Sequence, residues 1–368
     1  MTYRPSDLLR GRAVPDAVLQ DLPKTDLHVH LDGSLRPETF RDLGRQIGLD
    51  VPDDHREARR RFFPADRATD QPEFLTFFEH TLACLQTAEN LERAARELAE
   101  DAVAHGVRVL EARFCPLLHR SQGLDLDGAV AAVHCGLDTV ARRTGLRGGI
   151  IVTGLRTIDP AQSLELARLA VNWKGRGVVG FDLAGAEADH PAADHREAFY
   201  HVMNNNLPAT CHAGENFGPA SIHMAIHRCG AVRIGHGIRL EEDPGLLRYV
   251  ADHRIPLEIC LSSNVQTGVV RSAGEHPLRH YHELGLRLCL NTDNTLFADT
   301  DMVRELRLAV DTFDLTLLQL EDVLLAGFKS AFLPERTRRE LVEEALAAFA
   351  RVRDVHRLDE IAIKGISP

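Results

Sequence analysis

Apolar positions along the chain follow two alternating patterns, one typical of strands and one typical of amphipathic helices. Eight short runs rich in β-branched and apolar residues predict strands. These runs are KTDLHVH (24–30), VRVLEARF (107–114), RGGIIVTGL (147–155), VVGFDLA (178–184), PATCHA (208–213), VRIGHG (232–237), IPLEICLS (255–262) and LRLCLNT (286–292). Helical patterns such as residues 91–106 and 127–145 lie between most of them. Eight strand–helix repeats favour an α/β fold closed as a (β/α)₈ TIM-type barrel, with an open doubly wound sheet as the alternative.

Two parts of the chain exceed what a barrel needs. Residues 31–106 separate the first two strands and contain helical patterns at 37–48 and 72–86, which is too much chain for one connection. We expect this segment to be a helical insertion over the barrel mouth. Residues 301–355 also have a helical pattern throughout. Because no internal repeat or low-complexity linker interrupts the chain, we expect residues 1–368 to form a single domain.

Composition and charge narrow the classes of partner. The chain is 44% hydrophobic and 26% charged, which is ordinary for a globular protein, and its formal net charge is −11. An acidic chain without a block of basic residues is poorly suited to nucleic acid or anionic lipid. We therefore expect a small-molecule ligand, no nucleic acid and no membrane partner, while the sequence leaves the oligomeric state open.

Cysteine usage indicates the compartment. The seven cysteines are widely spaced, include no CxxC pair and fall partly in apolar runs, as Cys260 does in LEICL and Cys289 in LCL. Such residues behave as small buried hydrophobes with reduced thiols. The start of the chain, MTYRPSDLLRGR, has no apolar signal segment, and no apolar run reaches the ~18 residues of a membrane span. We expect a soluble cytoplasmic protein.

Whether a pair of histidines can bind a metal depends on the secondary structure in which it lies. With 19 histidines in the chain, about one HxH pair is expected by chance. His28 and His30 end a strand-like run, where alternate residues point to the same face and could share a metal. His280 and His282 lie in a helical pattern, where such residues point apart, so we expect them at the surface. The pair His223 and His227 could share a helix face but lacks the glutamate of an HExxH motif.

Polar residues recur where the predicted strands end. The fifth run closes with CHAGE, the sixth with GHG and the eighth with NTDN. The side chains at these ends and at the end of the first strand are His28, His30, His212, Glu215, His236, Asp293 and Asn294. The carboxyl ends of barrel strands form the rim on which barrel enzymes build their active sites.

The chemistry of these side chains is suited to zinc. Imidazole and carboxylate bind Zn²⁺ without thiolate, and three histidines with one aspartate would leave room for a water. The pKa of a water bound to zinc falls toward about 7, which supplies hydroxide at neutral pH. A structural zinc site would favour a closed, cysteine-rich cage, and the sequence contains no such cluster.

The motifs taken together resemble one enzyme family. KTDLHVHLDGSLRPET, DLAG, CHAGE, IGHG, EICLSSNVQTG, LNTDN and KSAFLPE occur in the order and at roughly the intervals of the adenosine deaminase family of the amidohydrolase superfamily. The resemblance runs from about residue 20 to about residue 350. It implies a (β/α)₈ barrel that hydrolyses adenosine or 2′-deoxyadenosine to inosine or 2′-deoxyinosine and ammonia, with one Zn²⁺ per chain.

The resemblance also implies a role for each site residue. Zinc would be held by His28, His30, His212 and Asp293. The catalytic pair would be Glu215, protonated to donate to purine N1, and His236, which would orient the metal-bound water and help to remove its proton. The substrate would be contacted by Gly185 at N3, by Asp32 at the ribose hydroxyls, by His30 and by Asn294.

One departure and three alternatives remain. Many family members carry a second aspartate at position 294, where this chain has Asn294, whose amide can donate to purine N7 without any pKa shift. Relatives that deaminate adenine or a modified adenosine, aminodeoxyfutalosine, are similar. SSNVQT and Asp32, which would be idle without a ribose, favour a nucleoside. A third alternative, from another class, is an inactive nucleoside-binding protein, but such proteins usually lose a ligand or the acid, and both are present here.

Overall fold

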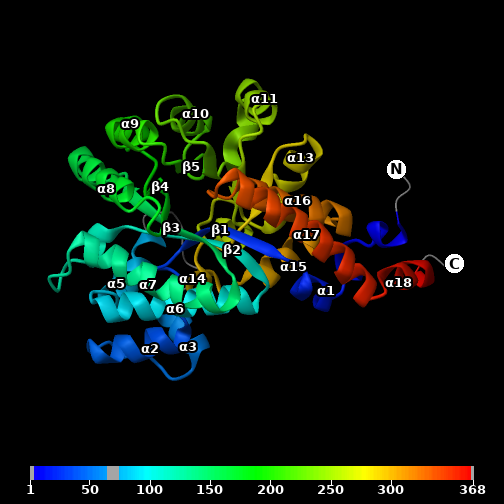
Figure 1. The fold of residues 1–368 in the computed structure, drawn as a ribbon, viewed down its shortest axis with the longest axis horizontal. Coiled ribbons are helices and arrows are strands. Elements are labelled where there is room, and N and C mark those ends of the chain that lie inside the picture. Colours follow the sequence, from blue (N-terminus) through cyan, green and yellow to red (C-terminus); the bar gives the residue numbers. More distant parts are fainter. Residues whose placement is uncertain (1–3, 64–73, 366–368) are drawn as a thin grey trace.

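A computed structural model describes residues 4–63 and 74–365. The strands of the described residues are β1 (Lys24–His30), β2 (Val107–Phe114), β3 (Arg147–Leu155), β4 (Val178–Ala184), β5 (Thr210–Ala213), β6 (Arg233–His236), β7 (Leu257–Ile259) and β8 (Leu288–Leu290). They pair in parallel as two sheets, in the orders β1-β2-β3-β4 and β5-β6-β7-β8. The eight strands alternate with helices, which confirms the predicted α/β class (Figure 1).

Parallel bridges join the two sheets at both seams. Phe181 of β4 pairs with Ala209, and Val29 of β1 pairs with Asp293, which lies just beyond β8. At the second seam the N–H of His30 donates to the carbonyl of Asp293 at 2.7 Å. The N–H of Asp293 donates to the carbonyl of His28 at 2.8 Å. The strands therefore follow one another around a (β/α)₈ barrel, and the second seam joins metal-site candidates from opposite ends of the chain.

The strand predictions are confirmed, with shorter bounds in the second half. The first four match in full, whereas β7 and β8 are only three residues long. Shortly after β7 the chain enters α12 (Leu261–Gln266). The last two residues predicted for that strand, Leu261 and Ser262, are therefore helical. His236 and Asp293 have φ angles of 62° and 63°, a conformation that breaks the extended backbone. β6 thus ends at His236, and Asp293 lies beyond the end of β8.

Helices surround the strands and extend the barrel at two places. Those up to β5 are α1 (Asp16–Asp21), α2 (Pro37–Gln46), α3 (His55–Phe62), α5 (Phe77–Cys84), α6 (Ala88–Ala104), α7 (Leu126–Thr144), α8 (Pro160–Asn172) and α9 (Arg196–Asn204). Those that follow are α10 (Pro219–His227), α11 (Pro244–Asp252), α12, α13 (Leu278–Glu283), α14 (Thr295–Ala298), α15 (Met302–Phe313), α16 (Leu317–Ser330), α17 (Glu335–Val355) and α18 (Leu358–Gly365). No described helix is long and apolar enough to cross a membrane.

The extra helices lie where the sequence predicts them. α2, α3, α5 and α6 fall between β1 and β2, and Figure 1 shows α2 and α3 below α6 at the edge of the molecule. Residues 64–73 of this insertion, including the start of the predicted helix 72–86, lie outside the described residues. α15, α16 and α17 confirm the helical pattern of residues 301–355. α18 lies beside the first described residues, where the N–H of Ser6 donates to Asp359 at 3.0 Å (Figure 1).

Candidate active site and metal centre

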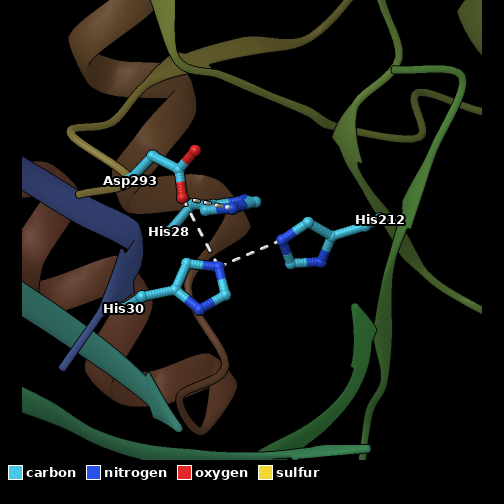
Figure 2. Close-up of side chains that lie close together, drawn as sticks. All are labelled: His28, His30, His212 and Asp293. Atoms are coloured by element: carbon cyan, nitrogen blue, oxygen red, sulfur yellow. Dashed lines mark hydrogen bonds and ion pairs between the residues drawn. The ribbon is translucent and has the colours of Figure 1, made fainter. Parts of the chain in front are cut away.

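Four side chains from distant parts of the chain converge at the carboxyl ends of the strands. His28 and His30 belong to β1, His212 to β5, and Asp293 follows β8 (Figure 2). One ligand atom from each lies within 4.8 Å of the others. These are the four residues that the family resemblance implies as metal ligands, and the structure brings all of them together.

The atoms that face one another in this cluster are potential metal-binding atoms. Nε2 of His30 lies 3.1 Å from Nε2 of His212, and Oδ1 of Asp293 lies 3.4 Å from Nε2 of both His28 and His30 (Figure 2). Nε2 of His28 is buried and has no hydrogen-bond partner among the residues that the structure describes. A buried polar atom without a partner is costly. A cation bound between the four residues would satisfy these atoms, so the arrangement fits a metal ion with nitrogen and oxygen ligands.

Carboxylates and a hydroxyl behind the cluster fix the orientation of its ligands. Nδ1 of His28 lies 2.8 Å from Oε2 of Glu258, and Nδ1 of His212 lies 3.2 Å from Oδ1 of Asp182. The hydroxyl of Ser263 donates to Oδ2 of Asp293 at 2.6 Å. Because each outer partner occupies the atom that faces away from the cluster, the inner atom is directed at the proposed metal position.

Two arginines balance the charge of these carboxylates. Arg113 contacts Asp182 at 3.1 Å and Glu258 at 2.9 Å, and Arg233 contacts Glu258 at 2.6 Å. Although burial opposes ionisation, Arg113 and Arg233 hold the pKa of Glu258 well below its usual range. Burial likewise opposes ionisation of Asp182, but His212 and Arg113 lower its pKa. Both carboxylates are therefore negative and can accept from the histidines.

Burial keeps two of the histidines neutral. It lowers the pKa of His28 to about 4 and that of His30 well below its usual value. At His212 burial acts in the same direction, but the adjacent Asp182 carboxylate raises the pKa. A neutral imidazole is the form that binds a metal, so the environment of His28 and His30 favours the ligand state.

Glu215 and His236 lie beside the cluster as a second pair of candidate residues. Nε2 of His236 lies 3.8 Å from Oε2 of Glu215, and both side chains are buried. Burial raises the pKa of Glu215, which favours the protonated acid. The side-chain amide of Asn264 lies 3.0 Å from Nδ1 of His236, and the hydroxyl of Thr267 lies 3.4 Å from Oε1 of Glu215. The pair is thus held in place from α12 and the residue that follows it.

A cavity of about 260 Å³ opens over the cluster and this pair. The site candidates that line it are His30, Asp32, Gly185, His212, Glu215, His236, Asp293 and Asn294. The side chains of Phe74, Leu75, Phe78 and Leu82, from the insertion between β1 and β2, form an apolar wall. No lysine or arginine lines the cavity among the described residues.

Two side-chain oxygens and one glycine in the lining of the cavity are free to contact a ligand. Oδ1 of Asp32 and Oδ1 of Asn294 are buried and lack hydrogen-bond partners within the described part of the chain. Gly185 has a φ of +94°, which L side chains rarely adopt, and a Cβ there would meet only the nitrogen of Arg156 within 4 Å, at 3.7 Å. The surface of Gly185 is therefore open to the cavity. These polar atoms and the bare backbone are available to a bound ligand.

Glu187 is a site residue that the sequence analysis missed. Its carboxylate accepts from the backbone N–H groups of Gly214 at 3.0 Å, Glu215 at 2.8 Å and Asn216 at 3.1 Å. Three such bonds fix the loop that carries Glu215. Asp182, Glu258, Ser263 and Asn264 were also missed as individual residues, although Asp182 belongs to DLAG and the last two to SSNVQT. Those motifs were the available signal.

The close approach of the strands requires a small residue beside His236. A Cβ on Gly235 would lie 3.0 Å from Cε1 of His28 and 3.1 Å from Cα of His212. Both distances are tighter than most real Cβ contacts. The first glycine of the GHG motif therefore leaves space for the rings of the cluster.

The remaining histidine and cysteine candidates lie apart from the metal cluster or fit a metal less well. His280 is exposed and His282 half-buried on α13, while His223 and His227 are exposed on α10 with ring centroids 4.4 Å apart. Neither pair belongs to a group of three or more potential ligands among the described residues. Cys260 forms a second potential group with His236 and Asp293, but burial raises its thiol pKa well above the usual value, which disfavours the thiolate.

Comparisons with known proteins agree with this geometry. The family model described as adenosine deaminase matches residues 23–348. Adenosine deaminase from Mycobacterium leprae is 41% identical over 89% of this chain and 95% of that protein. Adenosine deaminase from Mycobacteroides abscessus is 41% identical over 88% and 94%.

Solved structures show the same fold. Adenine deaminase from Arthrobacter aurescens has a TM-score of 0.82 and is 26% identical, with 89% of this chain and 98% of that chain covered. The N6-mAMP deaminase from arabidopsis has a TM-score of 0.80 at 26% identity, with 89% and 99% covered. The likeness thus extends over nearly the whole barrel.

Proposed function

Because this chain belongs to the adenosine deaminase family of hydrolytic enzymes, we propose that it converts adenosine and 2′-deoxyadenosine to inosine and 2′-deoxyinosine with release of ammonia. One observation carries the proposal. The buried acid Glu215, the imidazole of His236 and three members of the cluster, His30, His212 and Asp293, all line one cavity, with Glu215 and His236 3.8 Å apart. That is the set of groups needed to protonate a purine ring on one side and to deliver water to it on the other.

We propose that the metal is zinc, one ion per chain, held by His28, His30, His212 and Asp293. The buried, unpartnered Nε2 of His28 and the opposed nitrogens of His30 and His212 support this assignment. When bound, zinc lowers the pKa of a coordinated water from near 16 toward about 7. All four ligands have nitrogen or oxygen donors, which matches the preference of a catalytic zinc site.

The chain's own residues would move the protons. Hydrolysis adds water at C6 of the purine and expels the amino group as ammonia. Glu215, protonated because burial raises its pKa, would donate to N1 and make C6 more electrophilic. His236 would orient the attacking water and help to remove its proton, and the amide nitrogen of Asn264 contacts Nδ1 of the ring at 3.0 Å.

The remaining lining groups would position the nucleoside. The backbone at Gly185, open to the cavity, would contact N3, and Asp32 would accept from the ribose hydroxyls through its unpartnered oxygen. The amide of Asn294 would donate to N7 without first having to be protonated. His30, which lines both the cluster and the cavity, would touch the substrate as well as the metal.

The cavity favours a nucleoside over a nucleotide. A phosphate would enter a cavity whose described lining has no lysine or arginine and includes Asp32, Glu215 and Asp293. No lysine or arginine of the described lining would replace the hydration that the phosphate loses. Adenosine monophosphate should therefore be a poor substrate.

Adenine is the second candidate, because an adenine deaminase is among the solved structures of this fold at 26% identity. The apolar wall and Asp32 leave room for a ribose and a role for its hydroxyls, which supports the nucleoside. We would compare kcat/KM for adenosine, 2′-deoxyadenosine, adenine, aminodeoxyfutalosine and adenosine monophosphate on protein of known metal content. The proposal expects the two nucleosides to lead, and a preference of more than about tenfold for adenine would overturn it. Turnover of none of them would indicate an inactive nucleoside-binding protein.

Domain organisation and cellular location follow from the same features. We propose that residues 1–368 form one domain and that the insertion at 31–106 covers the barrel mouth, because Phe74, Phe78 and Leu82 line the cavity beside the catalytic groups. We also propose a cytoplasmic location. The separate burial of the Cys84, Cys211 and Cys289 thiols in the core supports a reducing compartment.

A further inference from the structure

The opposite end of the barrel carries a second, larger hollow. It measures about 870 Å³ and lies at the amino ends of the strands, where Val178 begins β4, Arg233 begins β6 and Arg287 precedes β8. Lys329 and Ser330 at the end of α16 and Arg338 of α17 close its other side. The hollow shares no lining residue with the catalytic cavity.

The charge of this hollow is opposite to that of the protein. Of the described residues, no aspartate or glutamate lines it, whereas six cationic side chains do: Lys174, Arg233, Arg254, Arg287, Lys329 and Arg338. The whole chain has a formal net charge of −11, so a concave site with only positive charge stands out from the surrounding surface. A concave surface lined by charges of one sign attracts small ligands of the opposite sign.

Two of these cations are already neutralised. Arg233 pairs with Glu111 and Glu258 beneath the floor of the hollow, and its guanidinium lies 3.6 Å from the centroid of the Phe332 ring. Arg338 pairs with Glu335 at 2.6 Å. These carboxylates lie outside the lining of the hollow. Arg233 and Arg338 therefore contribute shape and local potential more than free charge.

The other four cationic side chains of the hollow form no ion pair with a described carboxylate. Arg287 is half-buried, and its guanidinium makes no ion pair or hydrogen bond in the described structure. Burial, together with the charges of Arg254 and Arg338, lowers its pKa. Arg254 and Lys329 are exposed and are likewise free of ion pairs with described residues, and Lys174 donates only to the carbonyl of Asn205, at 2.7 Å. Asp322 pairs with His282 at 3.5 Å and lines a smaller pocket beside the hollow together with Arg254, Arg287 and Lys329.

From this arrangement we infer that the hollow at the amino ends of the strands binds a phosphate-bearing anion, with Arg287 as its central contact. Guanidinium groups bind phosphate oxygens in pairs, and a half-buried arginine with no partner gains the most from such a ligand. The volume exceeds what one phosphate fills, so a diphosphate or a nucleoside diphosphate suits it better. The site is independent of the proposed deaminase activity, since it uses none of the catalytic residues.

Calorimetric titration of the full chain with inorganic pyrophosphate, at a constant ionic strength of about 0.15 M, tests this inference. We expect one pyrophosphate per chain, and inorganic phosphate should bind more weakly. Arg287→Gln should weaken pyrophosphate binding by about tenfold or more. Lys329→Gln, an exposed second variant that should not disturb folding, should also weaken it. Arg168→Gln, at an exposed arginine of α8 that forms no ion pair with a described residue, is the matched control and should leave binding unchanged.

Titration with adenosine diphosphate identifies the source of the phosphate. If it binds more tightly than pyrophosphate, with the same sensitivity to Arg287→Gln, the ligand is a nucleotide. Equal affinity with that sensitivity indicates a free diphosphate. If pyrophosphate does not bind, or if Arg287→Gln and Lys329→Gln bind it as the unaltered protein does, the inference is wrong. In the last case the anion binds elsewhere, for example at the catalytic metal.

Discussion

Nδ1 of His28 lies 2.8 Å from Oε2 of Glu258, and neither side chain is exposed to solvent. Because Glu258 is held ionised by Arg113 and Arg233, it accepts a hydrogen bond from the N–H at Nδ1. The proton therefore stays on Nδ1, and Nε2 carries the lone pair. That nitrogen faces Asp293 and the other histidines. A contact between β1 and β7 thus decides which atom of His28 is presented to a metal.

Replacement of the proposed acid should separate chemistry from metal binding. Glu215→Gln keeps the shape of the side chain but cannot donate a carboxylic proton to N1. We expect the rate of adenosine deamination to fall by a factor on the order of 10³ or more, while zinc content stays unchanged. Steady-state kinetics and metal analysis of the same preparation measure both. Near-normal turnover would show that another group protonates the purine.

Removal of the carboxylate ligand should affect both properties. Asp293→Ala deletes the one oxygen ligand of the cluster, so zinc content and deamination should fall together. Asp299→Ala, which removes an exposed carboxylate a few residues away, is the matched control and should keep both. Full zinc occupancy in Asp293→Ala would mean that the fourth ligand is a different residue.

The hydroxyl behind Asp293 should tune metal affinity without being a ligand. Ser263 donates to Oδ2 of Asp293 at 2.6 Å, and loss of such an outer contact costs about 10- to 100-fold in metal affinity or activity. We therefore expect Ser263→Ala to weaken zinc binding by at least about tenfold in competition with a chelator. Its neighbour offers the control. Ser262 contacts Thr300 at 3.5 Å and not the cluster, so equal affinities of Ser262→Ala and Ser263→Ala would contradict this role.

Glu305 should make stability depend on pH. Burial raises its pKa to about 7, and the usual value is 4.5. The folded protein therefore holds this proton more tightly than the unfolded chain. Stability from this group is fully present below about pH 4.5 and is lost as the pH rises through about 7, by no more than about 3 kcal/mol.

Glu305→Gln tests this dependence. The amide can still accept from the N–H of Leu261, and it can donate to Thr300, whose hydroxyl lies near the carbonyl of Asp301. Denaturant unfolding of both proteins at pH 5 and pH 8.5 should show a smaller loss of stability at high pH in the variant. Parallel curves for the two proteins would indicate that Glu305 is ionised in the folded state.

Much of the site was predictable because its residues follow strands. The carboxyl ends of parallel strands meet at one rim, so His28, His30, His212, His236 and Asp293 could be brought together from strand positions alone. The glycines of GHG and DLAG are visible in sequence, but their reasons are spatial. Position 235 requires a glycine because a Cβ there would crowd the ring of His28. Gly185 has a φ that residues with a side chain rarely adopt.

The outer contacts could not be predicted in the same way. Glu258 lies within an apolar strand, 230 positions from His28, and a pattern of apolar residues does not indicate which side chain lies across the barrel. Glu187 acts through backbone N–H groups, which leave no trace in residue types. The short β7 and β8 were overestimated for a related reason. Turns that place Asp293 and α12 interrupt an otherwise strand-like pattern.

The central claim is that one ion held by His28, His30, His212 and Asp293 makes this chain a deaminase. Metal-depleted protein titrated with zinc, while the conversion of adenosine to inosine is followed by ultraviolet absorbance, tests it most directly. We expect negligible conversion without metal and a linear rise that ends at about one zinc per chain, in line with the one four-residue cluster among the described residues. Full conversion by the metal-depleted protein, or none after zinc is restored, would contradict it.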